Sequence, residues 1–140
     1  MKEILKVLAL AIIATLCFHT SHVLADQESQ AIDAAAPYLN LLDNGNIDGA
    51  YESMATIHKR TWIKEWWVKQ NEAQREFYGQ LINRSIRKTS KHDTIQRHPD
   101  GEYFKIQYES SFQNKQKAYE TIDLMLDSAG HWKVTGYYCN

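Results

Sequence analysis

Residues 99–115 constrain the fold most, because a turn, a long strand and a second turn follow one another there. Pro99-Asp100-Gly101 favours a turn, since proline fixes φ and glycine accepts a positive φ. The next residues alternate between two faces with a period of two, which is typical of a half-buried strand. The mainly apolar face carries Phe104, Ile106, Tyr108, Ser110 and Phe112. This segment therefore predicts a strand that packs one face against a core.

Three further strands are predicted around this one. Residues 119–127 alternate in the same way after a chain reversal at Asn114-Lys115, and the turn at residues 128–130 leads into a strand over residues 132–138. A strand from about residue 83 to residue 95 is rich in charged side chains, which suit a sheet edge because they discourage pairing between sheets. The last forty or so residues are therefore expected to form an antiparallel meander.

Three helices are predicted before the strands. Residues 27–42 carry apolar side chains at spacings of three and four, which indicates an amphipathic helix that Pro37 kinks or delays. Asp48 can cap a second, short helix. A third helix is predicted over residues 61–78, and Gly79 ends it.

The third helix has one apolar arc when its residues are placed about 100° apart. The arc consists of Trp62, Ile63, Trp66, Ala73 and Phe77. We expect it to face the core, with Trp67 and Tyr78 at its edge and Arg75 projecting away from it. Indole faces stack on sugars, but the helical spacing of Trp62 and Trp66 favours core packing, and only Trp67 is expected at the rim of a pocket.

Helices followed by about four antiparallel strands predict an α+β domain with the three helices packed on one face of a curved sheet. Long, strongly twisted strands would curve around the third helix and leave a cone-shaped hollow. The wide end of such a cone is where a ligand is expected.

The N-terminal segment predicts export. Lys2 and Lys6 precede an apolar run over residues 8–18, and Ala25 supplies the small residue before a cleavage site. Residues 1–25 are therefore expected to be a Sec-type signal peptide, and residues 26–140 a single mature domain in the periplasm or outside the cell. The apolar run is shorter than the roughly 20 residues that span a bilayer, so no stable membrane span is expected after cleavage.

The cysteines leave one alternative open for the N-terminus. Cys17 lies inside the apolar run, where it raises the possibility of lipid attachment, but Leu16 precedes it where a small residue is expected. After cleavage only Cys139 remains, so no internal disulfide can form.

Charge and motif content exclude several classes of function. Sixteen Lys and Arg against seventeen Asp and Glu give a net charge of -1, which argues against nucleic acid as a partner because phosphate binders carry a basic face. No two histidines of residues 26–140 have the i,i+2 or i,i+4 spacing that suits one metal ion, so neither a metal nor a cofactor is predicted. No nucleophile motif or phosphate-binding loop occurs, so no catalytic residue is assigned.

Glu120 is the leading site candidate. It shares its strand face with Ile122 and Leu124, where an ionised carboxylate is costly unless it is paired. It is either a functional carboxylate at a pocket mouth or a residue that meets water or an arginine. Tyr108 and Ser110 lie on the same face of the neighbouring strand, where their hydroxyls can serve a ligand. The complete set of pocket candidates is Glu120, Tyr108, Ser110, Trp67 and Tyr78.

Several short motifs resemble the bacterial exported family called domain of unknown function 4019. The C-terminal half carries them as 99-PDGEY-103, 106-IQY-108, 111-SF-112, 114-NK-115, 120-ET-121, Gly130-x-Trp132 and 136-GYY-138. The N-terminal half agrees more loosely, through Leu41-Leu42-Asp43-x-Gly45, Tyr51, Ser53, Trp66, Arg75, Gly79 and Arg84. The resemblance implies a fold similar to nuclear transport factor 2 and ketosteroid isomerase, and it implies no activity. Met54 departs from it, because a tryptophan is expected there.

Together these patterns predict a small, exported, non-enzymatic binding domain whose ligand is an unknown small molecule or protein. One alternative is an enzyme of the isomerase or dehydratase type that uses Glu120 with Tyr108, since a carboxylate with a shifted pKa can act as an acid or base. Another is an interaction or inhibitor module, for which a homodimer through the sheet is possible.

Overall fold

A computed structural model describes residues 24–140. The chain divides into two compact units, one that ends at Gln30 and one over Ala31–Asn140. The second unit contains every strand described below. The predicted signal peptide, apart from Leu24 and Ala25, lies outside the described residues, and so does Cys17.

Four helices are present in the described part of the chain, one more than predicted. Residues 24–43 are helical, and α2 Ile47–Ser53, α3 Thr56–Thr61 and α4 Lys64–Tyr78 follow. The second predicted helix is divided in two because Met54 and Ala55 are extended, and the Ala55 N–H donates to the Val134 carbonyl on a strand at 2.7 Å.

Two details of the helix ends and interior differ from the prediction. Pro37 lies on the exposed side of the helix over residues 24–43 and does not delay its start, because the helix is continuous from residue 24. Buried residues on both sides of the proline hold the helix against the core. The cap of α2 is Asn46 and not Asp48, because the Asn46 side chain accepts the Gly49 N–H at 2.9 Å.

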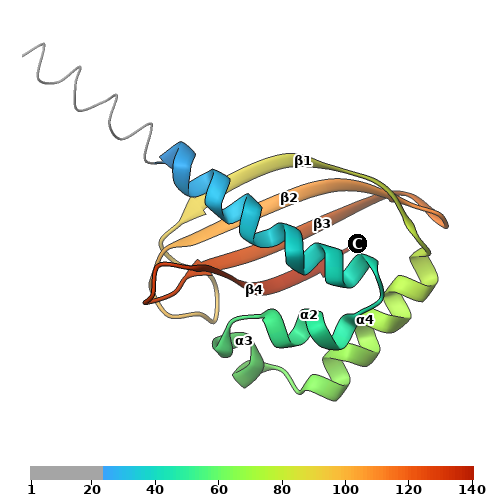
Figure 1. Cartoon of the computed structure of the whole chain (residues 1–140), viewed down its shortest axis with the longest axis horizontal. Coiled ribbons are helices and arrows are strands. Elements are labelled where there is room, and N and C mark those ends of the chain that lie inside the picture. Colours follow the sequence, from blue (N-terminus) through green and yellow to red (C-terminus); the bar gives the residue numbers. More distant parts are fainter. Residues whose placement is uncertain (1–23) are drawn as a thin grey trace, which may run out of the picture. The chain divides into compact units, whose positions relative to one another are not determined.

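The four strands form one antiparallel sheet in sequence order, as Figure 1 shows. They are β1 Leu81–His92, β2 Tyr103–Phe112, β3 Lys115–Leu126 and β4 Trp132–Cys139. The predicted meander and the position of β1 at an edge are both confirmed. The protein is therefore an α+β domain with an open antiparallel sheet.

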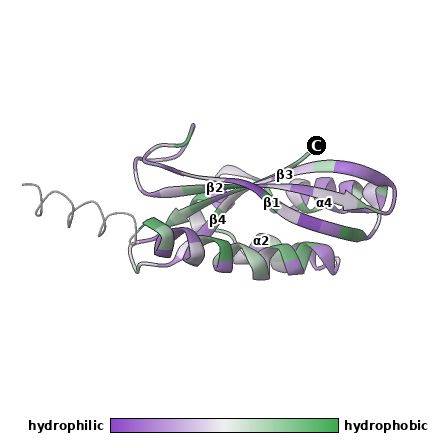
Figure 2. Cartoon of the chain, turned by 90° about the horizontal axis from the view of Figure 1, so that it is seen from above, coloured by the Kyte–Doolittle hydropathy of each residue, from purple (hydrophilic) through white to green (hydrophobic). Residues whose placement is uncertain are grey.

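The core lies between the helices and one face of the sheet. All five positions assigned to the inner face of β2 are buried, from Phe104 to Phe112. Phe104, Ile106 and Tyr108 pack with residues of β3 and β4 and with buried side chains of α2 and of residues 31–42, whereas Phe112 packs with Tyr78 and Ala118. Figure 2 shows α2 on one side of the sheet, and both the helical layer and the strands carry hydrophobic segments. The period of two in the sequence is thus a correct guide to the buried face.

The predicted orientation of α4 is wrong. Trp66 is 50% exposed and Phe77 is 73% exposed, whereas Trp67 and Tyr78 are buried. Trp67 packs on Tyr51, with ring centroids 5.5 Å apart. The helix is therefore rotated by about one residue, or 100°, from the predicted orientation, and most of its apolar arc lies at the surface.

Candidate functional site

Glu120 lies in the interior, in the middle of a cluster of charged and polar side chains. Its carboxylate has no exposed surface. Arg84 Nε donates to Oε2 at 2.6 Å, and Ser110 Oγ donates to the same oxygen. Tyr137 Oη, Arg84 Nη2 and Arg75 Nη2 donate to Oε1 at 2.7, 3.0 and 3.3 Å. Both carboxylate oxygens are therefore fully supplied with donors.

Asp43 completes the cluster at the end of the helix over residues 24–43. Arg84 donates two hydrogen bonds to the Asp43 carboxylate, one of 2.6 Å from Nη1 to Oδ2 and one of 2.9 Å from Nη2 to Oδ1. Arg75 Nη1 donates to Oδ1 at 3.0 Å. Two arginines thus face two carboxylates, so the cluster has no net charge and joins the first helix, α4, β1, β3 and β4.

The electrostatic surroundings keep Glu120 ionised. Burial would raise its pKa, but the hydrogen bonds and charge of Arg84, with the hydrogen bonds from Ser110 and Tyr137, outweigh burial and place the pKa below its ordinary value. Tyr108 behaves differently, because burial raises its pKa to about 12. An ionised Glu120 saturated with donors therefore belongs to an interior ion-pair network, and a protonated Tyr108 lies buried beside it.

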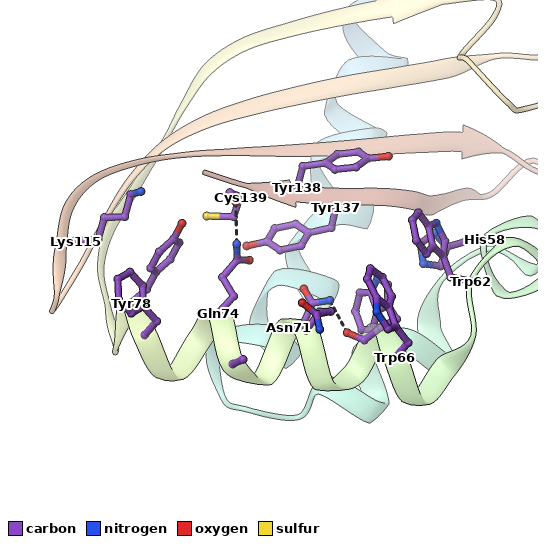
Figure 3. Close-up of a pocket in the computed structure, with 14 residues that line it drawn as sticks. His58, Trp62, Trp66, Asn71, Gln74, Tyr78, Lys115, Tyr137, Tyr138 and Cys139 are labelled. Atoms are coloured by element: carbon purple, nitrogen blue, oxygen red, sulfur yellow. Dashed lines mark hydrogen bonds between the residues drawn. The ribbon is translucent and has the colours of Figure 1, made fainter.

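A separate pocket of about 650 Å³ lies between α4 and β4 (Figure 3). Its lining residues are His58, Trp62, Trp66, Trp67, Gln70, Asn71, Ala73, Gln74, Phe77, Tyr78, Lys115, Tyr137, Tyr138 and Cys139. Aromatic rings dominate this lining, and amide side chains lie between them. The pocket therefore offers flat apolar surfaces next to hydrogen-bonding groups.

Two exposed tryptophans form one end of the pocket. The indoles of Trp62 and Trp66 stack with centroids 5.2 Å apart and planes only 11° from parallel. Trp62 is 36% exposed. Both were predicted to pack in the core, so sequence analysis missed them as pocket residues. Trp62 lies in the extended link between α3 and α4, whereas Trp66 is in α4, so the stack depends on the break between the two helices, which the sequence pattern did not reveal.

The five predicted pocket residues fall into two groups. Trp67 and Tyr78 line the pocket. Glu120 and Ser110 belong to the interior network, and Tyr108 lies buried beside it. Tyr137 joins the two regions, because its ring lines the pocket while its hydroxyl donates to Glu120. The structure thus places the network beneath the floor of the pocket.

His58 and Cys139 bring titratable groups to the pocket. His58 Nδ1 lies 2.8 Å from the Thr135 carbonyl and therefore carries the proton, while Nε2 is buried without a partner. Burial lowers the pKa of His58, although the bond to Thr135 opposes that effect. Burial, aided by the charge of Glu120, raises the pKa of the Cys139 thiol to about 11. Both groups are neutral near pH 7.

Neither a metal centre nor a membrane crossing is found in residues 24–140. They contain no group of three or more His, Cys, Asp or Glu side chains placed to hold a metal ion. None of their helices combines the length and the apolar character that a crossing requires.

Comparison with known proteins gives one match. The model of a family described as "Protein of unknown function (DUF4019)" matches residues 34–137. This range contains Asp43, Arg75, Arg84 and Glu120, and most of the pocket lining. No curated protein and no solved structure matches the chain.

Proposed function

The chain belongs to the family called domain of unknown function 4019, and we propose that it is an exported, non-enzymatic binding domain that holds a small ligand between α4 and β4. The pocket of about 650 Å³ carries this proposal. Its volume is within the range of small-molecule sites, which are mostly apolar and aromatic with a few polar groups. Trp66 and Tyr138 line it and are 50% and 58% exposed, so they offer uncovered ring surface to a ligand.

The lining favours a particular kind of ligand. Trp62 and Trp66 present stacked ring faces, and the amides of Gln70 and Asn71 lie one turn further along α4. Lys115 is the one cation among the described lining residues, which include no carboxylate. We therefore infer a ligand with a flat or ring-shaped apolar part that is neutral or anionic.

Binding is favoured over catalysis by the position of Glu120. An acid or base must come within hydrogen-bond reach of its substrate. Glu120 has no exposed surface, and the hydrogen bonds and charge of Arg84, with the hydrogen bonds from Ser110 and Tyr137, outweigh burial and lower its pKa, which suits a structural ion pair. The isomerase or dehydratase alternative with Glu120 and Tyr108 is therefore the weaker proposal.

The proposal also includes a cone-shaped fold and a location outside the cytoplasm. The helices on one face of a four-stranded meander support a cone similar to nuclear transport factor 2. The basic residues, apolar run and Ala25 near the N-terminus support export to the periplasm or beyond, with cleavage after Ala25. An exported protein whose mass includes residues 1–25 would contradict this cleavage site.

The pocket can be tested with 1-anilinonaphthalene-8-sulfonate, a flat apolar dye with one negative charge. We expect the folded protein to bind it with increased dye fluorescence, and Trp66→Ala to weaken binding about tenfold, which corresponds to the loss of one aromatic contact. Ile82→Ala is the matched control, because Ile82 is 70% exposed on β1 and does not line the pocket. Equal affinity in all three proteins would contradict the proposal.

Native mass spectrometry of protein purified from the exported fraction complements the dye experiment. A ligand that copurifies should appear as a mass above that of the chain, and Trp66→Ala should reduce its occupancy. The measurement also reports the cleavage site.

A further inference from the structure

Three polar side chains in the lining of the pocket are oriented by hydrogen bonds to the backbone. His58 Nδ1, Asn71 Nδ2 and Gln74 Nε2 each lie 2.8 Å from a backbone carbonyl oxygen. A carbonyl oxygen only accepts, so it fixes which end of each side chain donates. The other ends, His58 Nε2, Asn71 Oδ1 and Gln74 Oε1, are therefore acceptors.

None of these three acceptors has a hydrogen-bond partner within residues 24–140. His58 Nε2 is buried and unpaired. The hydrogen bonds that Asn71 and Gln74 make in this part of the chain use only their side-chain nitrogens. A buried acceptor without a donor is costly, and folded proteins rarely leave one unpaired. The pocket therefore presents three acceptors of fixed orientation to the ligand that it binds.

We propose that this ligand is a neutral saccharide, whose ring packs on the indole of Trp66 and whose hydroxyls donate to His58, Asn71 and Gln74. The inference rests on the proposed function, because it names the class of ligand that the pocket between α4 and β4 holds.

The spacing of the acceptors requires several hydroxyls on one ligand. Asn71 and Gln74 are three residues apart on α4, which separates their Cβ atoms by about 5–6 Å. His58 lies on α3, at the end of the lining that Trp62 and Trp66 form in Figure 3. A single hydroxyl donates one hydrogen bond and serves one acceptor. A sugar carries hydroxyls on neighbouring carbons around its ring, so it supplies several donors at once.

The rest of the polar lining favours hydroxyls over amino groups. Lys115 and Gln70 line the same pocket and can donate, and a hydroxyl accepts as well as donates. An ammonium group only donates, and it would meet the charge of Lys115 in a described lining that contains no carboxylate. A neutral, hydroxylated ligand satisfies both kinds of group.

Trp66 supplies the apolar surface on which a sugar ring packs. Its indole stacks on Trp62 with the planes 11° apart, which covers one face, and it is 50% exposed. The C–H groups on one side of a sugar ring form an apolar face that fits an open indole. Core packing, which the sequence favours for both tryptophans, would exclude a sugar, but their exposure removes that obstacle.

His58 Nε2 becomes accessible when Trp62 turns. Three aromatic rings surround His58, and of these Tyr51 and Trp67 are buried whereas Trp62 is 36% exposed. Trp62 has extended backbone between α3 and α4, so its side chain is outside both helices. Displacement of this indole by the ligand lets a hydroxyl supply the donor that Nε2 lacks.

Saturation-transfer NMR of the exported protein with cellobiose, maltose, lactose and diacetylchitobiose, each up to about 20 mM, tests the proposal over the range of weak sugar affinities. At least one disaccharide should bind wild type. Asn71→Leu and Gln74→Leu should each weaken that binding about three- to tenfold, the value of one hydrogen bond. Gln116→Leu is the matched control, because Gln116 is exposed on β3 outside the lining. Urea unfolding verifies that each variant is folded.

The imidazole of His58 gives a second measurement on wild type alone. In nitrogen-15 NMR the bound disaccharide should shift the Nε2 resonance and leave Nδ1 in place, since Nδ1 stays on the Thr135 carbonyl.

Two results would overturn the proposal. One is that none of the four disaccharides binds. The other is a disaccharide that binds the Asn71, Gln74 and Gln116 variants equally well and leaves Nε2 unshifted, because its hydroxyls then lie elsewhere. A protein that binds the anilinonaphthalene dye through Trp66 but no disaccharide would remove the saccharide and leave the proposed function standing. Loss of both kinds of binding would remove both proposals.

Discussion

Arg84 on the edge strand β1 grips Glu120 on β3 with two hydrogen bonds, 2.6 Å from Nε to Oε2 and 3.0 Å from Nη2 to Oε1, although β2 lies between the two strands. Long side chains on the inner face of the sheet make this contact across the intervening strand. A buried ion pair adds little net stability, since desolvation offsets the attraction, but removing one partner leaves the other charge uncompensated. The pair therefore acts mainly on the specificity of packing at this end of the core.

The first prediction concerns the loss of that carboxylate. Glu120→Gln should lower the free energy of unfolding by about 3–5 kcal/mol, because Arg84 and Arg75 are then left with one negative charge between them. Urea unfolding measures the change. Glu109→Gln is the control, since Glu109 is exposed on the other face of β2 and should change stability by no more than about 0.5 kcal/mol. Equal stability of the two variants would show that the buried network contributes nothing.

The second prediction concerns the dependence of stability on pH through His58. Burial lowers the pKa of His58 below its ordinary 6.5, so the unfolded chain binds a proton at a higher pH than the folded protein does. The contribution of neutral His58 to the free energy of unfolding is therefore fully present above about pH 6.5. It is lost as the pH falls toward the pKa that His58 has in the folded protein. Urea midpoints between pH 7.5 and 5 should therefore decrease in wild type.

The variant His58→Gln should have a flatter profile in that window, because glutamine can still donate to the Thr135 carbonyl but does not titrate. His131→Gln provides the comparison, since the His131 side chain is 70% exposed. If His131→Gln flattens the profile and His58→Gln does not, the pH dependence comes from elsewhere.

The third prediction separates the two adjacent tryptophans of α4. Trp67→Ala should destabilise the fold by about 3–5 kcal/mol, because it empties a buried site between Tyr51 and His58. Trp66→Ala should cost at most about 1 kcal/mol, the value of its stack on Trp62. Thermal and urea unfolding of both variants give the comparison. If Trp66→Ala destabilised the fold more than Trp67→Ala, the result would support the orientation of α4 that the sequence predicts, with Trp66 in the core.

The strands were predictable from the sequence because a period of two leaves only two choices of face. Phe104 and Phe112 settle that choice, and the whole inner face of β2 follows from them. A helix allows any rotation about its axis, and α4 carries two adjacent tryptophans, Trp66 and Trp67, on neighbouring faces, so hydrophobicity alone favours the wrong side. The actual rotation is set by Arg75, which turns inward to Asp43 and Glu120. No local pattern encodes a contact between residues so far apart in the chain.

The interior network around Glu120 was likewise predictable only in part from the sequence. The alternation of β3 correctly placed Glu120 on the apolar side, and the cost of a buried charge indicated that it needs a partner. Nothing in the spacing identified Arg84, since pairing across the intervening strand depends on the register of two long strands. The pocket was predicted only in part. Trp67 and Tyr78 were chosen because they lie at the edge of the predicted apolar arc, but in the structure they are buried and most of that arc is exposed.

The fourth prediction uses the thiol of Cys139 as a reporter of the pocket. Burial raises its pKa from 9.0 to about 11, and the thiolate is the reactive form. At pH 8 the folded protein should therefore react with iodoacetamide about a hundredfold more slowly than the chain unfolded in urea. Because Cys139 lines the pocket, saturating dye should slow the reaction further, whereas Trp66→Ala should weaken that protection. Peptide mass spectrometry assigns the modified residue. A native thiol that reacts as fast as the unfolded one, with or without dye, would mean that the pocket does not enclose Cys139.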